Sequence, residues 1–235
     1  MLKTVLLFCL LTIPFACTTH SPAQVRVEKK GVNGHRYTIF HPDHLSIQVV
    51  TTRPRVDGER CQLSVAAAYT DLESDKPLDL LVCQGGVLQD SARLGYLDGV
   101  LTILGDSLTI TAIGKGQTPS YVQQVRRLRG TLLLQELLVY KGKNQRAAGG
   151  SLFQRRALVE FLHHSFAVVE GETNNLTMGQ FADDLLGLGA VNALYLDMGD
   201  WDEGWYREGG EVKVLGNRRT QTGRQSNWLV FGVGD

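Results

Sequence analysis

Residues 165–197 constrain the fold of this chain most strongly, because they predict three secondary-structure elements in direct succession. Residues 165–170 are rich in apolar and β-branched side chains, as in a strand. Residues 177–180 then match a capping box, which predicts the start of a helix. Residues 191–196 predict a second strand, which ends at Asp197. A unit of this kind brings its two strands near each other in the parallel orientation.

Short strand-like runs, separated by proline and glycine, fill most of the remaining chain. They are rich in β-branched, aromatic or leucine residues and are bounded by turn-forming residues, which is typical of β-structure. These runs are residues 37–40, 45–50, 63–69, 80–83, 95–104, 108–113 and 228–231.

Two stretches leave the type of element open. Residues 121–140 fit either a helix or a pair of buried strands, and the break at Gly130 favours strands. Residues 155–170 predict a hairpin around His163 and His164, whereas a helix over residues 151–164 fits the same apolar positions. The sequence therefore predicts an α+β fold. It would be a mixed, mainly antiparallel β-sheet with a few helices, including the strand-helix-strand unit near the C-terminus.

The charge balance excludes some classes of partner. Lys plus Arg and Asp plus Glu number 24 each, so the formal net charge is zero and we expect no nucleic-acid partner. With 43% hydrophobic and 20% charged residues, the composition is that of a globular protein rather than a disordered one. The basic run at residues 125–129 is interpreted as one charged strand or loop face rather than as a binding patch.

Residues 1–23 have the features of a secretory segment. A positive charge precedes the uncharged apolar run at residues 5–15, which is too short for a stable bilayer span and suits a signal core. Cys17 stands in a loose lipobox, which predicts a lipid-anchored protein; ordinary signal cleavage after Ala23 is the alternative. Either cleavage makes the mature protein extracytoplasmic: secreted, periplasmic or a membrane-anchored lipoprotein. Residues 24–235 are then expected to form a single domain.

Two further cysteines, Cys61 and Cys83, belong to the predicted domain. In an oxidising compartment they can form a disulfide. Two buried thiols fit the sequence equally well, because the spacing of cysteines says nothing about their distance in the fold.

Five stretches carry a resemblance to a known family. In order, they contain an arginine before Ala-Leu, a strand, a Leu-Thr helix start, a Leu-Gly-Ala turn into a strand that ends in aspartate, and a last strand. They are residues 155–158, 166–169, 176–181, 188–199 and 227–230. The chain resembles the phosphodiester glycosidase family, the group related to the lysosomal uncovering enzyme N-acetylglucosamine-1-phosphodiester alpha-N-acetylglucosaminidase, as a divergent secreted member of bacterial type.

The chain departs from the family pattern at two places. Residues 66–70, Ala-Ala-Ala-Tyr-Thr, stand where the family has Asn-Gly-Gly-Phe. Met198 replaces the glycine after the aspartate, and an acidic, aromatic loop at residues 200–205 replaces a run rich in glycine and serine. These departures locate substrate choice, or loss of activity, in residues 198–205.

The resemblance and the chemistry of glycoside cleavage together suggest three catalytic residues. Cleavage of a glycosidic bond uses carboxylates, and a phosphate leaving group needs a cation to hold it. Asp197 is the leading carboxylate and Arg155 the leading phosphate clamp, because the arginine fork matches phosphate geometry. Glu170 is the candidate second carboxylate. The alternative role of Asp197 is to cap the following turn. The alternative for Glu170 is a solvated acid at a strand end.

Further residues are expected to bind the substrate. Arg156 is the alternative phosphate clamp, since strand alternation turns only one of the two arginines inward. Tyrosine and tryptophan suit a sugar face, because the aromatic ring stacks on it while the polar end of the side chain can form a hydrogen bond. The other candidates for substrate binding carry a hydroxyl, a carboxylate or an imidazole. Together, the candidates are Tyr69, Thr70, His164, Asp200, Trp201 and Trp205.

We expect no metal and no other cofactor. An EF-hand loop that starts at Asp200 fails, because Gly204 falls one position early. The predicted protein is an extracytoplasmic hydrolase of glycosyl phosphodiesters or related glycosides in surface glycans. The alternatives are a non-catalytic glycan-binding envelope lipoprotein on the same fold and a structural protein of the envelope.

The choice between the two cleavage sites can be tested directly. If Cys17 carries the lipid, Cys17→Ser moves the protein from the detergent phase to the aqueous phase after expression in a bacterial host. Intact-mass spectrometry is expected to show the diacylglycerol adduct on the wild type only. A mature N-terminus at Gln24 in both forms would instead show ordinary signal cleavage.

Overall fold

The computed structural model describes residues 22–114, 118–199, 202–217 and 219–233. Antiparallel β-structure dominates these residues, arranged in three sheets. Two α-helices accompany the sheets in the described part of the chain: α1 (Thr118–Arg127) and α2 (Met178–Gly187).

The largest sheet has seven strands, and every neighbouring pair is antiparallel. In spatial order they are β1 (Gln24–Val32), β2 (His35–Asp43), β13 (Ser165–Gly171), β12 (Arg156–Phe161), β14 (Asn192–Leu196), β10 (Leu137–Tyr140) and β11 (Lys143–Asn144). Because β12 is antiparallel to both β13 and β14 and lies between them, β13 and β14 run in the same direction without pairing. Helix α2 connects these two strands.

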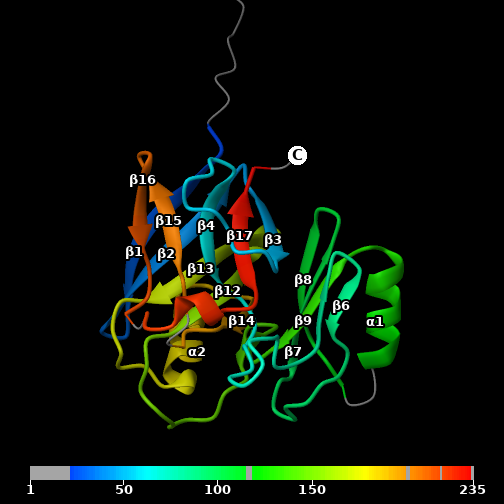
Figure 1. Cartoon of the computed structure of the whole chain (residues 1–235). Helices are drawn as coiled ribbons and strands as arrows, with labels where there is room; N and C mark the ends of the chain where they lie inside the picture. The colour runs from blue at the N-terminus through cyan, green and yellow to red at the C-terminus, as the bar shows by residue number, and fades with distance from the viewer. Residues whose placement is uncertain (1–21, 115–117, 200–201, 218, 234–235) are drawn as a thin grey trace, which may run out of the picture.

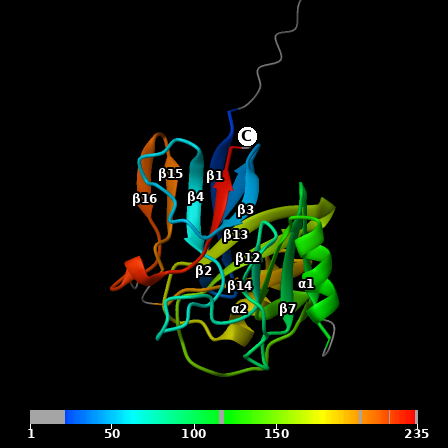
Figure 2. The same ribbon diagram turned by 45° about the vertical axis from the view of Figure 1, so that its right-hand side comes forward.

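Two five-stranded sheets complete the structure. The second sheet contains, in order, β16 (Glu211–Val214), β15 (Trp205–Glu208), β4 (Cys61–Ala66), β17 (Trp228–Gly232) and β3 (Ser46–Val50). The third contains β6 (Gly86–Gln89), β5 (Leu81–Cys83), β9 (Thr131–Gln135), β7 (Gly99–Leu104) and β8 (Ser107–Ala112). Figure 1 shows the second sheet at the upper left and the third at the right, with α1 on the outer side of the third sheet. Figure 2 shows the same separation from another angle.

One hydrophobic cluster joins all three sheets. Phe40 and Leu158 enter it from the first sheet, Leu63 and Phe231 from the second, and Leu101 from the third, and all five are fully buried. Burial of such side chains is the main stabilising contribution to a fold of this size. The three sheets therefore share a core.

A second cluster fills the space between the first sheet and α2. Phe181 of α2 stacks on Tyr37 of β2, with ring centroids 6.0 Å apart. The buried carboxylate of Asp184 accepts hydrogen bonds from Tyr37, from Asn33 Nδ2 at 2.7 Å and from the ring of His35 at 2.7 Å. These bonds fix the β1–β2 turn on the helix.

The capping box predicted for α2 is confirmed. Gln180 N–H donates to Thr177 Oγ1 at 3.2 Å, and Thr177 N–H donates to Gln180 Oε1 at 3.0 Å. The helix ends at Gly187, and Gly189 has a φ of +98°, a value that favours glycine.

The hairpin predicted around His163 and His164 is also confirmed. Strands β12 and β13 pair from Arg156 to Phe161, and the two histidines form the turn with left-handed φ angles of 59° and 57°. The competing helix over residues 151–164 is therefore wrong.

The strand prediction for residues 121–140 is only partly correct. Residues 131–135 and 137–140 are the strands β9 and β10, but residues 118–127 form α1. The basic run at residues 125–129 is therefore not a strand: it lies at the end of α1 and in the turn that follows the helix at Leu128 and Arg129. Val125 is buried against the third sheet while Arg126 and Arg127 are exposed, so packing of one apolar stripe decides the helical form.

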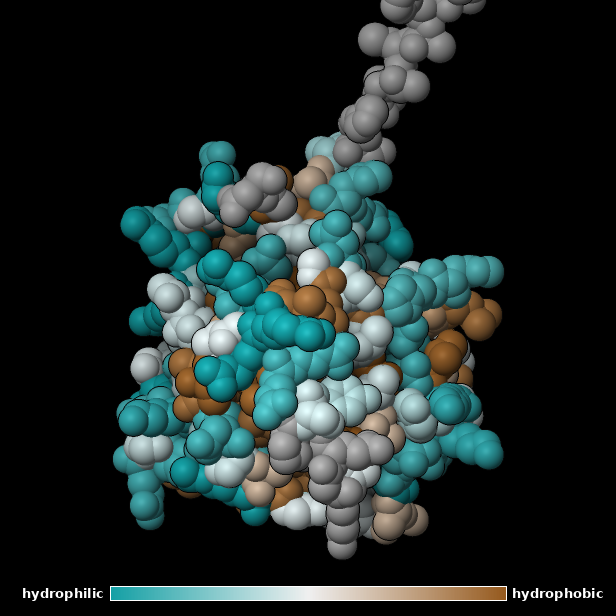
Figure 3. All heavy atoms as spheres, turned by 90° about the vertical axis from the view of Figure 1, so that its right-hand side faces the viewer, coloured by the Kyte–Doolittle hydropathy of each residue, from teal (hydrophilic) through white to brown (hydrophobic). Residues whose placement is uncertain are grey.

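The face that carries α1 is mostly hydrophilic. Figure 3 shows polar side chains across this face, with hydrophobic residues scattered among them. Within the described ranges, no helix is both long and apolar enough to cross a membrane.

The capping box gives a stability prediction. Thr177→Ala removes the acceptor for Gln180 N–H and is expected to lower the free energy of unfolding by about 1 kcal/mol. Urea unfolding followed by circular dichroism measures this difference. The same change at the exposed Thr220 is the control and should leave the unfolding midpoint unchanged. Equal effects of the two substitutions would contradict a specific contribution from the cap.

Candidate functional site

The end of β14 and the segment that follows β4 lie against each other. Asp197 is the first residue after β14, and its N–H donates to Ala67 O at 3.1 Å. Tyr69 and Thr70 follow in the chain after Ala67 and Ala68. The structure therefore brings three of the predicted site residues, Asp197, Tyr69 and Thr70, to one place.

The Asp197 carboxyl group lies in an environment that favours its protonated form. Burial raises the pKa of Asp197 to about 6, and the negative charge of Asp202 adds to the shift. The N–H of Gly199 donates to Asp197 Oδ1 at 3.1 Å and acts in the opposite direction. A carboxyl group that titrates near neutrality is suited to exchanging a proton with a substrate.

Arg155 is held by aromatic rings and backbone carbonyls. Its guanidinium carbon lies 5.2 Å from the ring centroid of Phe153 and 5.8 Å from that of Tyr195. Nη2 donates to Ser151 O at 2.8 Å and Nε to Leu176 O at 3.2 Å. No carboxylate of the described ranges forms an ion pair with Arg155, so its positive charge is not neutralised by an acidic partner.

Tyr195 connects Arg155 with the Asp197 side of the site. Burial raises the pKa of Tyr195 to about 12; the positive charge of Arg155 opposes the shift, and the negative charge of Asp197 adds to it. The ring of Tyr195 lies 6.1 Å from that of Tyr69, centroid to centroid. The arginine, the two phenols and the aspartate thus form one continuous group.

Sequence reasoning missed Glu136 and Arg146, which extend this group. Tyr69 OH donates to Glu136 Oε1 at 2.7 Å, and Arg146 Nη1 donates to Glu136 Oε2 at 3.4 Å. Arg146 also pairs with Asp98. One signal was available, since Glu136 is the only charged residue in the apolar run of residues 131–140.

Arg156 and Glu170 lie beneath the site rather than in it. Arg156 is 0% exposed and donates from Nε to Glu170 Oε2 at 2.7 Å and from Nη1 to Asp202 Oδ1 at 2.8 Å. Burial raises the pKa of Glu170 despite the adjacent arginine. Gln154 Nε2 adds a hydrogen bond to Glu170 at 2.9 Å. This geometry corrects two expectations: Arg156 has no surface on which to hold a phosphate, and Glu170 is already paired.

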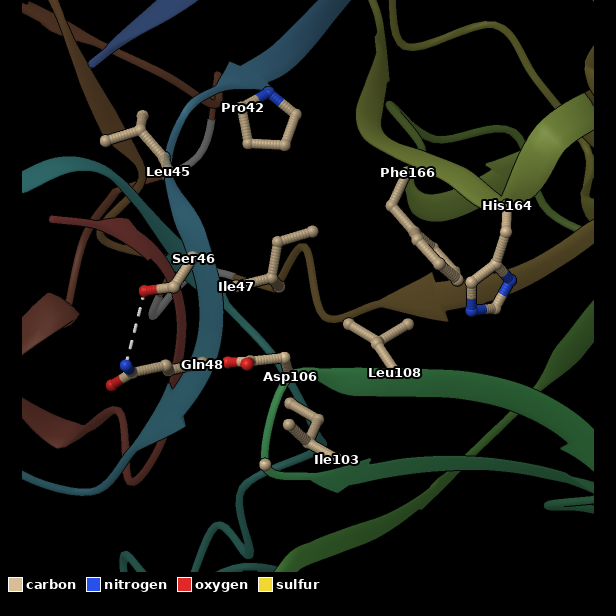
Figure 4. A pocket seen from close by; sticks show the side chains of 11 residues that line it. Pro42, Leu45, Ser46, Ile47, Gln48, Ile103, Asp106, Leu108, His164 and Phe166 are labelled. Atoms are coloured by element: carbon tan, nitrogen blue, oxygen red, sulfur yellow. Dashed lines mark hydrogen bonds between the residues drawn. The ribbon is translucent and has the colours of Figure 1, made fainter. Parts of the chain in front are cut away.

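His164 lies at the opposite end of the β12–β13 hairpin from Arg156 and Asp197. Its ring is 2.6 Å from Glu160 Oε1 and lines a separate cavity of about 380 Å³, together with Phe166, Leu108 and Asp106 (Figure 4). The length of the β12–β13 strand pair separates His164 from Asp197. This corrects the expectation that His164 binds the same substrate as Asp197.

Trp205 is a strand residue rather than a sugar platform. It begins β15, is 2% exposed, and its ring lies 5.7 Å from the guanidinium carbon of Arg207. A buried ring cannot stack on a ligand, which corrects the expectation for Trp205. Asp200 and Trp201 lie outside the described residues.

Thr70 holds two segments together. Its Oγ1 lies 2.8 Å from Ser226 Oγ and accepts from Ser226 N–H at 3.2 Å. Next to it, Asn227 Oδ1 accepts from Ala68 N–H at 2.7 Å. Thr70 therefore positions the chain around Tyr69 through contacts with the segment just before β17.

Cys61 and Cys83 are free thiols in the structure. Burial raises the pKa of Cys61 to about 11, which keeps its thiol protonated at neutral pH. Among the described residues, no group of three or more His, Cys, Asp or Glu side chains could hold a metal ion.

Comparisons with known proteins show a shared fold. No family model matches this chain, and no curated protein matches it by sequence. The fold is similar to the catalytic domain of zebrafish N-acetylglucosamine-1-phosphodiester alpha-N-acetylglucosaminidase, solved in a form auto-inhibited by its pro-peptide. The TM-score is 0.62 at 13% identity, over 92% of this chain and 85% of that chain.

A second solved structure, a hypothetical protein from Synechocystis, is also similar. The TM-score is 0.56 at 14% identity, and the match covers 91% of this chain but only 64% of that one. Likeness at such low identity demonstrates the fold alone. The chain therefore has a fold similar to that of a glycosidase catalytic domain.

The raised pKa of Asp197 predicts a pH-dependent stability. The folded state binds this proton more tightly than the unfolded chain, so the contribution of Asp197 to stability is largest below pH 3.8 and is lost as the pH rises to about 6. Asp197→Asn removes the ionisation and is expected to be stabilising above about pH 6 and neutral below pH 3.8. Thermal unfolding of both forms across this range measures the difference, and a constant offset at every pH would contradict the shift.

Proposed function

We propose that this protein is an extracytoplasmic hydrolase of glycosyl phosphodiesters or of related glycosides in surface glycans. The observation that carries the proposal is that Asp197, whose pKa is raised to about 6, and Arg155, which forms an ion pair with no carboxylate of the described residues, belong to one continuous group of side chains. The guanidinium of Arg155 lies over the ring of Tyr195, and the charge of Asp197 also acts on Tyr195. The glycosidase-like fold supports the same class of reaction.

The proposed roles follow from the charges. Arg155 holds the phosphate, because a planar guanidinium can donate two parallel hydrogen bonds to its oxygens. Asp197 is the carboxylate beside the anomeric carbon, where positive charge develops as the glycosidic bond breaks. A phosphodiester leaves as a weak base, so its departure depends on the cation more than on an acid.

The proposal extends to location and partners. Residues 1–23 would act as a signal peptide or lipoprotein tether, with Cys17 as the lipid attachment site, and residues 24–235 as one phosphodiester glycosidase-like domain. The partner is a carbohydrate or a glycosyl phosphodiester.

Two substitutions test the proposed roles against a panel of sugar-1-phosphodiesters, with release of the free sugar as the readout. Asp197→Asn is expected to lower kcat by about 100-fold or more, because it removes the carboxylate at the reacting carbon. Arg155→Ala is expected to raise KM for phosphodiesters, while Arg155→Lys retains part of the binding. Arg55→Ala and Asp57→Asn make the same changes in an exposed ion pair and are the controls.

Full activity in both site variants would show that the assigned roles are wrong. Glycan binding by the wild type without turnover of any substrate would support the non-catalytic alternative. An absence of both binding and turnover would leave the structural role in the envelope.

A further inference from the structure

We infer that Glu136, held by Arg146, positions the Tyr69 hydroxyl as the second proton-transfer group of the site. This inference rests on the proposed hydrolase function and names a group that the function still needs. Tyr69 would touch the reacting water and is the catalytic residue. Glu136 would act through Tyr69 and is a positioning residue.

Hydrolysis at a sugar carbon needs a base to take a proton from the attacking water. Glu170 does not supply it, because its carboxylate is buried, at 6% exposure, and among the described residues bonds only Arg156, Gln154 and backbone in the interior. Glu136 differs in position, since it follows β9 and its backbone carbonyl accepts from Tyr195 N–H at 2.9 Å. That bond attaches Glu136 to β14 two residues before Asp197.

Tyr69 interacts with both carboxyl groups. Its hydroxyl donates to Glu136 Oε1 at 2.7 Å, and the negative charge of Asp197 also acts on it. Burial, together with the charges of Glu136 and Asp197, raises the pKa of Tyr69, so the phenol stays protonated at neutral pH. Because its proton is directed at Glu136, the lone pairs of its oxygen are free to accept a hydrogen bond from water.

Arg146 fixes the geometry of Glu136. It bonds Glu136 Oε2 at 3.4 Å and pairs with Asp98, whose Oδ1 accepts from Leu137 N–H at 3.0 Å. The carboxylate is thus held on both oxygens and has only a small freedom to move. Preorganisation of this kind is what a proton relay requires, because the acceptor must stay within hydrogen-bond distance of the donor.

The step balances as follows. An oxygen lone pair of water forms the new bond to the anomeric carbon, and the bond from that carbon to the phosphate oxygen breaks with its electrons on the phosphate, which Arg155 holds. The water proton moves to Tyr69 as the Tyr69 proton moves to Glu136. Solvent then takes the proton from Glu136 and restores the pair.

The test compares Tyr69→Phe, Glu136→Gln and the double variant on the sugar-1-phosphodiester that the wild type turns over best. Each single substitution is expected to lower kcat by about 100-fold with little change in KM, because each breaks the same relay. For that reason the double variant should be no slower than the singles. Glu160→Gln is the matched control, since Glu160 is 14% exposed, binds a histidine and lies at the far end of β12.

Azide separates a chemical role from a structural one. Azide attacks without losing a proton, so it should restore turnover, as the glycosyl azide, in Tyr69→Phe and Glu136→Gln but not in Arg155→Ala. If Glu136→Gln fails to fold by circular dichroism, Tyr69→Phe, which removes a single oxygen atom, carries the test.

Wild-type kcat in Tyr69→Phe, independent losses that multiply in the double variant, or no response to azide would overturn the inference while leaving the hydrolase function intact. A wild type that is inactive on every glycosyl phosphodiester would overturn the hydrolase function itself, and the inference with it.

Discussion

The buried ion cluster of Arg156, Glu170 and Asp202 is the interaction on which the rest of the structure depends. Arg156 and Glu170 come from neighbouring strands of the first sheet, and Asp202 also accepts from Ala66 N–H at the end of β4 in the second sheet. A Cβ at Gly204 would lie 2.9 Å from Arg156 Nη2, so the chain can approach the guanidinium closely only with glycine there. Loss of one partner in such a cluster costs about 3–5 kcal/mol, because it leaves an uncompensated buried charge.

The acidic residues that follow β14 differ in whether an arginine pairs with them. Arg156 donates to Asp202, and Arg53 Nε donates to Glu203 Oε2 at 2.6 Å. Both acids are therefore neutralised by arginines. Asp197 has no such partner among the described residues, and its charge acts on Tyr69 and Tyr195. Besides burial, the charge of Asp202 raises the pKa of Asp197 and that of Arg156 lowers it, so the internal ion cluster acts electrostatically on the candidate catalytic carboxyl group.

Local sequence patterns predicted the elements whose form depends on local chemistry. The capping box at Thr177 and the hairpin around His163 were predictable, since each needs only a few neighbouring residues. Helix α1 was not, because its residues also fit a strand, and packing against the third sheet decides between the two forms. The sheet order was equally hidden, since the insertion of β12 between β13 and β14 depends on pairing between segments far apart in the chain.

The sequence by itself determined that a strand delivers Asp197 to a turn beside a capped helix, because these features follow from periodicity and capping. Only the tertiary structure decided which charged residues are free to act. Glu170 is buried in an ion pair with Arg156, and Trp205 is buried in the second sheet. Glu136, at the connection between β9 and β10, accepts a hydrogen bond from Tyr69, which is distant in the sequence. The physical reason is that the state of a charge depends on its partners and its solvent exposure, and residues distant in the sequence supply both.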